Sequence, residues 1–370
     1  MPCEGHGDSI FQGKGADLTN QAEKVLVALS GGVDSAVAAF LLHRQGYRVH
    51  CMFIKMTGTR QEEAALSSAR KISESFGLPF YVVDRQDAFK RTVIEYFTET
   101  YQQGLTPNPC VVCNPEIKFG AMAETANRLG IRFLASGHYA RIKKNKTGHV
   151  FLLKALDEKK DQSYFLHRLK PKQLRTIIMP LGTITRKEVE KIAEEIGIAS
   201  LIQKESQDVC FLRGDYREFI RHGIDKAVSR PGFIKTTNGT IKGHHKGLFD
   251  FTIGQRRGLA IPDATPYYVI RLDVETNTLV IGKEDELFTT SCRITQINWL
   301  FRPSKKMLKK NVYVKLRSRH RASRAIVSLD STDSSRGTID FLEPQRAVTP
   351  GQFAVFYSGP LVIGGGTVCK

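Results

Sequence analysis

The sequence predicts an α/β protein in which a parallel-sheet domain comes first and a β-rich region follows. Two observations support this fold class. Short apolar runs alternate with amphipathic segments through the first half of the chain, as in the βαβ units of a parallel sheet. Later, long helical patterns vanish, and β-branched residues and glycine dominate. The 370 residues allow two or three domains, and 41% hydrophobic with 25% charged residues is ordinary for a globular protein.

The first half is predicted to contain four strands and four helices. Continuous apolar runs predict strands at Lys24–Leu29, Tyr47–Met56, Pro79–Asp84 and Ile131–Ser136. Apolar residues at helical spacing predict helices at Ala36–Gln45, Glu62–Phe76, Ala88–Gln102 and Ile117–Leu129. A further helix should begin after Thr185, because Glu188 completes a capping box with it, and end at Gly197. Ligands of such sheets bind at the carboxyl ends of the strands.

The β-rich region is predicted to begin near Arg230. A hairpin is expected from Tyr267–Val274 and Thr278–Gly282, with its turn at Glu275–Asn277. Four more short strands are predicted at Val312–Leu316, Ala325–Leu329, Gly337–Leu342 and Phe353–Tyr357. These strands predict one or two small β domains, the last of them a barrel. At the other end of the chain, the polar, glycine-rich segment Met1–Asn20 predicts a flexible tail.

The charge and the cysteines narrow the class of protein. A net charge of +18 indicates a polyanionic partner such as a nucleic acid, or only general solubility. Residues 286–370 hold 14 lysines and arginines against 5 acidic residues, which is half of the net charge. No apolar run approaches the roughly 18–20 residues of a membrane span, and no secretory signal is visible. Seven cysteines then favour free thiols in a reducing compartment, and we expect a cytoplasmic protein.

A glycine-rich string, Ser30-Gly31-Gly32-Val33-Asp34-Ser35, joins the first predicted strand to the first helix. Two glycines let the backbone approach an anion closely, and the start of a helix offers unpaired N–H groups. Because no lysine stands in the Walker position, a kinase-type P-loop is not supported. The string resembles the PP-loop of the ATP pyrophosphatases, which split ATP between the α and β phosphates. In that resemblance Asp34 faces Mg²⁺ or orients the loop.

Two segments place cysteines in polar surroundings. Thr106–Asn114 is predicted to be a stiff loop between two helices, and its Cys110 and Cys113 form a C-x-x-C pair. Half of a zinc site and a redox dithiol both stay open for this pair, although no second C-x-x-C is present to complete a zinc site. Cys210 follows Ser206-Gln207-Asp208-Val209, and by itself it would be interpreted as a buried structural thiol.

Six motifs, in order, resemble those of the tRNA-specific 2-thiouridylases. They are S-G-G-V-D-S at Ser30–Ser35, T-P-N-P-x-x-x-C-N at Thr106–Asn114, G-H-Y-A at Gly137–Ala140, K-D-Q-S-Y-F-L at Lys160–Leu166, S-Q-x-x-C-F at Ser206–Phe211 and F-T-x-G-Q-R-x-G-L at Phe251–Leu259. The resemblance runs from about Lys24 to the C-terminus. It implies a PP-loop domain over residues 21–222, a small central domain over 223–285 and a tRNA-binding β-barrel over 286–370, behind a tail of residues 1–20.

The resemblance implies an ATP-dependent sulfur transfer that makes 2-thiouridine at the wobble position of tRNA. ATP, with Mg²⁺, would adenylate the C2 oxygen of the uridine. Cys113 would be the nucleophile and Cys210 would carry a persulfide, and the two would end as a disulfide that must be reduced. Because these thiols are far apart in sequence, we expect a mobile segment around Cys210. The residues that match ATP contacts are Ala28, Leu29, Ser30, Gly31, Gly32, Val33, Asp34, Ser35, Ile54 and Gly137. No residue is assigned as a metal ligand.

A second set of residues matches tRNA contacts in this family. Asn108, Pro109 and Cys110 match the pocket for the flipped target base, and the others are His138, Lys160, Asp161, Gln162, Arg317, Ser318 and Gln352. Many relatives have Asp where this chain has Cys110, so a carboxylate-like role is not expected there. The implied partners are tRNAs for Lys, Glu and Gln and a protein that donates persulfide sulfur. No membrane partner is implied.

Two other readings of the motifs stay open. One is another PP-loop ATP pyrophosphatase, such as a 4-thiouridine or an amide-forming synthetase, although the amide-forming members need neither two reactive cysteines nor a basic barrel. The other is a zinc-containing RNA-binding protein without catalysis. Bound zinc and release of pyrophosphate would separate these possibilities.

Overall fold

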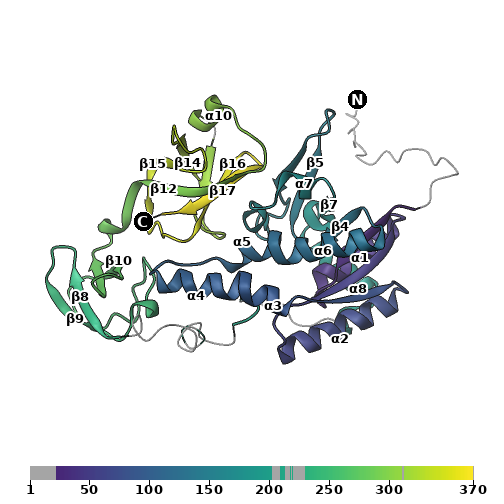
Figure 1. Cartoon of the computed structure of the whole chain (residues 1–370), viewed down its shortest axis with the longest axis horizontal. Coiled ribbons are helices and arrows are strands. Elements are labelled where there is room, and N and C mark those ends of the chain that lie inside the picture. The colour runs from purple at the N-terminus through teal and green to yellow at the C-terminus, as the bar shows by residue number, and fades with distance from the viewer. Residues whose placement is uncertain are drawn as a thin grey trace, which may run out of the picture.

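The chain folds into three parts that follow one another in the sequence (Figure 1). The computed structural model describes residues 22–201, 209–212, 217, 219, 230–310 and 312–369, so the predicted tail Met1–Asn20 and residues 202–208 before Cys210 lie outside the described residues. A parallel sheet with helices forms the first part, a small mixed sheet the second and a closed barrel the third, which confirms the predicted fold class. Among the described helices, none is long and apolar enough to cross a membrane.

The first part is built on a parallel sheet with the strand order β3-β2-β1-β4-β7. Its strands are β1 (Lys24–Ala28), β2 (Arg48–Lys55), β3 (Phe80–Asp84), β4 (Phe133–Ser136) and β7 (Ile177–Ile178), which include all four predicted ones. The central strand β1 is buried on both faces, because Val25 and Val27 pack into one apolar cluster and Leu26 into another. The carboxyl ends of β1, β2 and β4 therefore lie side by side at one edge of the sheet.

Helices cover both faces of this sheet (Figure 1). On the face of Val25 lie α1 (Val33–Arg44), α2 (Arg60–Ser75) and α8 (Arg186–Glu195), and on the opposite face lies α6 (Phe119–Leu129). The capping box predicted for α8 is present. The Thr185 Oγ1 accepts the Glu188 N–H at 3.3 Å, and the Glu188 Oε2 accepts the Thr185 N–H at 2.6 Å.

Two helical stretches differ from the prediction. The expected helix at Ala88–Gln102 is made of α3 (Gln86–Phe89), a π-helical turn η1 (Lys90–Ile94) and α4 (Glu95–Gln102). The predicted loop at Thr106–Asn114 is wrong from Pro109 onward, where α5 (Pro109–Cys113) and a second π-helical turn, η2 (Asn114–Lys118), lead directly into α6. Pro109 fits the first position of a helix, because the N–H that it lacks would have had no partner there. Pro109, one of the two prolines that suggested a stiff loop, therefore begins a helix.

The second part is a four-stranded sheet with the order β10-β11-β8-β9. Its elements are β8 (Gly232–Thr236), β9 (Ile241–His245), the 3-10 turn η6 (Leu248–Asp250), β10 (Tyr268–Asp273), β11 (Thr278–Gly282) and the 3-10 turn η7 (Asp285–Leu287). The predicted hairpin is confirmed by the antiparallel pairing of β10 with β11. Asn277 takes the left-handed conformation, with φ +47°, in the turn between them.

The third part is a six-stranded barrel. Its elements are β12 (Phe288–Trp299), α10 (Lys305–Lys310), β13 (Val312–Lys315), β14 (Ser323–Leu329), β15 (Gly337–Arg346), β16 (Phe353–Ser358) and β17 (Leu361–Val368). The barrel closes because β12 pairs with both β15 and β17. The four predicted strands correspond to β13–β16, whereas β12 and β17 were not predicted.

A hairpin of the first part continues into the barrel sheet. It consists of β5 (Ala140–Lys144) and β6 (Val150–Lys154), and Leu153 pairs with Leu361 of β17. The chain then passes through η3 (Ser163–Leu166), α7 (Pro171–Leu174), η4 (Pro180–Thr183) and η5 (Ala199–Leu201), of which η3 lies against the barrel. There the Tyr164 hydroxyl donates to the Phe353 carbonyl at 2.9 Å. One apolar cluster holds Leu26 of the sheet together with Phe353 of the barrel, so the two parts share a core.

Candidate active site

The glycine loop connects β1 to α1, and Gly32 is the residue just before the helix. The Ser35 Oγ donates to the Gly32 carbonyl at 2.9 Å and accepts the Ser30 N–H at 3.0 Å, so the two serines tie the loop to the first turn. Gly31 has a φ of +79°, and a Cβ there would lie 2.4 Å from the carbonyl oxygen of Ala65 in α2. The first-turn N–H groups of α1 have no partner within the helix, which is what a phosphate cradle requires.

Asp34, in the first turn of α1, is held from two sides. Its Oδ1 accepts a hydrogen bond from the Tyr139 hydroxyl at 2.7 Å and forms an ion pair with the Arg186 Nη1 at 2.8 Å. The side chains of this ion pair are only 21% and 18% exposed. Burial and the Asp34 carboxylate raise the pKa of Tyr139, which keeps its proton on the hydroxyl. Of the two roles predicted for Asp34, these contacts support orientation of the loop.

The end of β4 lies directly against the glycine loop. A Cβ on Gly137 would lie 2.7 Å from the backbone carbon of Asp34 and 2.7 Å from the nitrogen of Ser35. Two other residues predicted to bind ATP turn their side chains away, because Leu29 is 1% and Ile54 8% exposed and both pack in the core. These two positions offer a nucleotide mainly their backbone.

Three thiols, those of Cys110, Cys113 and Cys210, form the second half of the site, and we call them the thiol cluster. Charge on Cys110 or Cys210 raises the pKa of Cys113, so the three lie within electrostatic range of one another. Burial raises the pKa of Cys113 to about 12. All three are free thiols, with Cys113 buried and the other two exposed.

Aromatic packing brings Cys210 to α5. The ring of the next residue, Phe211, meets the rings of Phe97 at 5.2 Å and Phe89 at 5.7 Å, both edge to face. Cys113 belongs to the same buried cluster. Cys113 therefore packs in one cluster with the residues on either side of Cys210, and the reaction between the two cysteines stays a prediction. The mobile segment expected around Cys210 falls largely outside the described residues and stays a prediction.

Two basic side chains, those of His138 and Lys118, interact electrostatically with each other. His138 follows Gly137, and its Nδ1 shares a 2.9 Å hydrogen bond with the Ser136 Oγ. Burial, and then the charge of Lys118, lowers the pKa of His138 to about 3, so its imidazole is neutral at pH 7. Lys118 itself interacts electrostatically with all three thiols. Sequence reasoning missed Lys118, and its place five residues after Cys113 was the only available signal.

The residues predicted to receive the target base lie at the start of α5. Asn108 precedes the helix, and its N–H donates to the Tyr96 hydroxyl at 3.4 Å. Pro109 is buried at the first helical position, and Cys110 is exposed next to it. The predicted base pocket and the predicted nucleophile Cys113 therefore share one short helix.

The predicted tRNA contacts between β6 and η3 also hold the fold together. The Asp161 Oδ1 accepts the Ala155 N–H at 3.0 Å, and the Gln162 Oε1 accepts the Tyr139 N–H at 2.9 Å. Lys160, next to them, is half-buried. These hydrogen bonds fix the segment that leads to the barrel.

The predicted tRNA contacts in the barrel fall into two places. The Gln352 Nε2 donates to the carbonyls of Thr106 at 3.1 Å and Pro107 at 3.0 Å, so Gln352 joins the barrel to the segment before α5. Arg317 and Ser318 follow β13, and the Arg317 Nη2 donates within the barrel to the Ala347 carbonyl at 3.1 Å. The structure brings Gln352 toward the thiol cluster but not Arg317.

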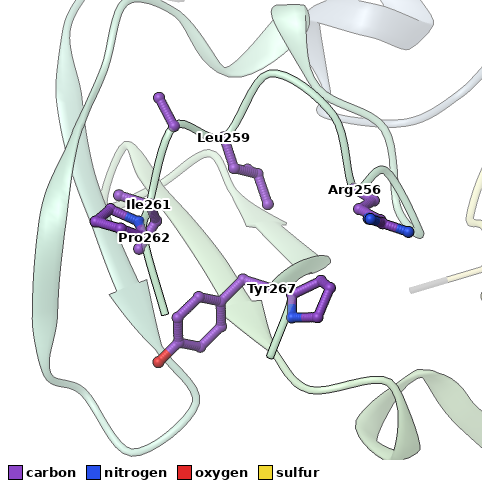
Figure 2. A pocket seen from close by; sticks show the side chains of 7 residues that line it. Arg256, Leu259, Ile261, Pro262 and Tyr267 are labelled. Carbon is purple, nitrogen blue, oxygen red and sulfur yellow. The ribbon is translucent and has the colours of Figure 1, made fainter. Parts of the chain in front are cut away.

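Two further features bear on the alternatives. Within the described ranges, no group of three or more His, Cys, Asp or Glu side chains is arranged to hold a metal ion. A pocket is present in the central part (Figure 2), and its lining residues are Arg256, Leu259, Ala260, Ile261, Pro262, Pro266 and Tyr267. Arg256 and Leu259 belong to the predicted motif Phe251–Leu259 and the others follow it, and none of them is a predicted site residue.

Comparison with known proteins gives full-length relatives. Three family models match in order: the tRNA methyl transferase HUP domain over residues 23–214, the tRNA methyl transferase PRC-barrel domain over 217–283 and the aminomethyltransferase beta-barrel domain over 289–368. The chain is 38% identical to the tRNA-specific 2-thiouridylase MnmA of Acetivibrio thermocellus, over 94% of this chain and 99% of that one. It is 42% identical to the protein of the same description from Syntrophomonas wolfei, over 93% and 99%. The relative from Treponema denticola is 40% identical, over 93% and 97%.

Proposed function

Because the chain belongs to the family of tRNA-specific 2-thiouridylases, which are sulfur-transferring enzymes, we propose that it replaces the C2 oxygen of the wobble uridine by sulfur from a persulfide on Cys210. The contact between its two half-sites carries this proposal. Gly137 packs on the backbone of Asp34 in the glycine loop, and the ring of His138, the next residue, lies 6.1 Å from the ring of Phe119, where α6 begins after α5 and η2. An anion cradle and sulfur nucleophiles therefore meet at the carboxyl edge of one sheet.

The first half-reaction would use the glycine loop. ATP would place its phosphates at Ser30–Ser35, against the first-turn N–H groups of α1. The C2 oxygen of the uridine would attack the α-phosphorus, so that AMP becomes bonded to this oxygen and pyrophosphate leaves. Asp34, paired with Arg186 and Tyr139, would hold the loop in place. Mg²⁺ would accompany ATP on its phosphate oxygens and neutralise part of their charge.

The second half-reaction would use the thiol cluster. The terminal sulfur of the Cys210 persulfide would bond to C2, and AMP would leave with the former C2 oxygen. The Cys113 thiolate would then attack the sulfur of Cys210, which releases 2-thiouridine and leaves a Cys113–Cys210 disulfide. An external thiol must supply the two electrons that reduce this disulfide. Cys110, a thiol where many relatives have a carboxylate, would contact the target base.

The partners follow from the charge and the chemistry. The basic barrel, with α10 (Lys305–Lys310) on its surface, would bind the phosphates of tRNA, and the substrates would be tRNAs for Lys, Glu and Gln as in the family. Lys160, Arg317 and Ser318 would contribute to this surface. A second protein would deliver the persulfide sulfur. Free thiols that must be reduced in each cycle suit the cytoplasm.

One experiment tests the proposal. The full chain is incubated with ATP, Mg²⁺, a persulfide source and unmodified tRNA, and the nucleosides are analysed by mass. We expect 2-thiouridine from the wild type, and none from Cys113→Ala or Cys210→Ala, although both variants should bind tRNA normally. The matched control is Cys292→Ala, which alters a half-buried thiol on β12 and should leave activity intact.

Other products would contradict the proposal. 4-Thiouridine would assign the chain to a different thiolation reaction. Robust activity of either cysteine variant would remove Cys113 or Cys210 from the mechanism. Stoichiometric zinc without pyrophosphate release would show a binding protein without catalysis.

A further inference from the structure

The turn between β2 and α2, residues 56–59, is organised around one carboxylate. The Glu62 Oε1 accepts the N–H groups of Met56 at 2.6 Å and Thr57 at 3.0 Å. Its Oε2 accepts the same Thr57 N–H at 3.0 Å and the Gly58 N–H at 2.8 Å. Three consecutive backbone donors therefore end on a single side chain from the first turn of α2.

Further contacts hold this turn in place. The Thr59 Oγ1 accepts the Glu62 N–H at 3.3 Å, which caps α2, and it shares a 3.1 Å hydrogen bond with the Thr57 Oγ1. Gly58 has a φ of +63° and packs so closely on the Gln86 side chain that an added Cβ would collide with it. The turn is therefore held by α2 on one side and by the start of α3 on the other.

The turn lies at the same sheet edge as the glycine loop. β2 is the neighbour of β1 in the sheet, and the N–H of Leu29, just before the loop, donates to the Met52 carbonyl at 2.8 Å. α2 contacts the loop as well, because the Ala65 carbonyl lies against Gly31. Ile54, which is predicted to pack against adenine, stands two residues before the turn. A nucleotide with its phosphates in the glycine loop and its base at Ile54 would therefore have this turn beside its base.

Glu62 decides which backbone groups the turn can offer to that base. In a planar trans peptide, the carbonyl points away from the N–H. Because the three N–H groups are directed at the carboxylate, the carbonyls of the same peptides, those of Lys55, Met56 and Thr57, point away from it. The Lys55 carbonyl accepts the Arg85 N–H at 2.8 Å. The turn can therefore offer hydrogen-bond acceptors to a base, while its donors are already used.

We propose that Glu62 is a positioning residue that determines base specificity: it occupies the N–H donors of residues 56–58 and so leaves an edge that accepts hydrogen bonds. Adenine presents its 6-amino donor to such an edge, whereas guanine presents the acceptor O6 at the same place. A backbone carbonyl opposite O6 would leave two acceptors facing each other without a donor. ATP is thus selected over GTP by a side chain that acts through the backbone. The inference rests on the proposed function, because it takes ATP as the nucleotide bound there.

The test compares the binding of ATP and GTP to the full-length chain without tRNA. Isothermal titration calorimetry with Mg²⁺ gives the ratio of the Kd for GTP to the Kd for ATP in the wild type and in each variant. We expect Glu62→Ala to lower this ratio about tenfold, because a peptide that the carboxylate no longer holds can rotate and donate its N–H to O6 of guanine.

Glu63→Ala is the matched control, because it removes the neighbouring carboxylate of the same helical turn. Glu63 pairs instead with the Lys55 ammonium, at 2.7 Å. The ratio should therefore stay at the wild-type value in this variant. Equal weakening of ATP and GTP binding in Glu62→Ala, with an unchanged ratio, would overturn the inference and make the carboxylate a brace of the turn only. A wild type that binds both nucleotides equally would overturn it as well.

Two further measurements keep the outcome clear. If circular dichroism shows no melting transition for Glu62→Ala, Glu62→Gln replaces it. Its amide keeps one acceptor oxygen, so it should lower the ratio by a smaller factor, and an unchanged ratio would again overturn the inference. Formation of 2-thiouridine by the wild type separates the two proposals. With this product present, an unchanged ratio refutes the inference alone, and with the product absent, a lowered ratio refutes the proposed function alone.

Discussion

Replacing Gly31 with alanine tests how tightly the glycine loop is packed. With a φ of +79°, an added Cβ is strained by about 1–2 kcal/mol. The Cβ would also lie 2.4 Å from the carbonyl oxygen of Ala65, and such overpacking against backbone costs about 1–3 kcal/mol. Gly31→Ala should therefore lower the free energy of unfolding by about 2–5 kcal/mol and the Tm by roughly 5–15 °C. Circular dichroism melting without nucleotide measures this shift.

Gly32→Ala is the matched control, because it makes the same chemical change one residue later. Gly32 has an ordinary φ of −96°, and the nearest atom to an added Cβ is the Ser30 Oγ at 3.7 Å. The free energy of unfolding of Gly32→Ala should stay within about 0.5 kcal/mol of the wild-type value. Equal melting temperatures for the two variants would refute the packing argument, whichever way ATP binding changed.

Two more perturbations address the supports of the site. Arg186→Met leaves the Asp34 carboxylate without its ion pair. Because that pair is about one-fifth exposed, we expect a loss of about 1–3 kcal/mol in urea unfolding and weaker ATP binding, and wild-type values for both would contradict the role given to Asp34. His167 is fully buried, and burial lowers its pKa to about 4. The unfolded chain therefore binds a proton at this histidine more readily than the folded chain does. The contribution of His167 to the free energy of unfolding is complete above pH 6.5 and falls by about 3 kcal/mol as the pH drops to 4. Urea unfolding at several pH values should show this loss in the wild type and less of it in His167→Gln. Identical dependence of stability on pH in the two proteins would show that His167 is not the group that causes the loss.

The fold could be predicted from the sequence where a strand is buried on both faces and therefore appears as a continuous apolar run. The strands of the parallel sheet are apolar on both faces, so their positions follow from the sequence alone. β17 escaped prediction because it contains Gly364, Gly365 and Gly366, which are poor strand formers. They are needed there, since a Cβ on Gly364 would lie 2.2 Å from the Asn298 carbonyl oxygen of β12. Glycine is required at this position because β17 pairs with β12 to close the barrel. The two strands are far apart in the sequence, so no local pattern reveals the requirement.

The site was predictable as a set of motifs but not as a set of contacts. The resemblance placed Cys113 and Cys210 in one reaction, and the structure packs Cys113 in one cluster with Phe211, the residue after Cys210. The partners that hold Asp34, namely Tyr139 and Arg186, act through tertiary contacts, which no local pattern of the sequence reveals. Side-chain electrostatics of this kind depends on distances that only the folded chain defines.

The hydrogen bonds of Gln352 connect the two ends of the proposed reaction. Its amide binds the carbonyls of Thr106 and Pro107, and the Thr106 N–H donates to the Pro350 carbonyl at 3.0 Å. The segment directly before α5 is thus fixed to the barrel from both its N–H and its C=O groups. A tRNA held by the basic barrel would meet α5 at a distance set by these bonds and not by a flexible linker. In the proposed reaction the barrel would therefore do more than add affinity, because it would determine where a bound uridine lies relative to Cys113.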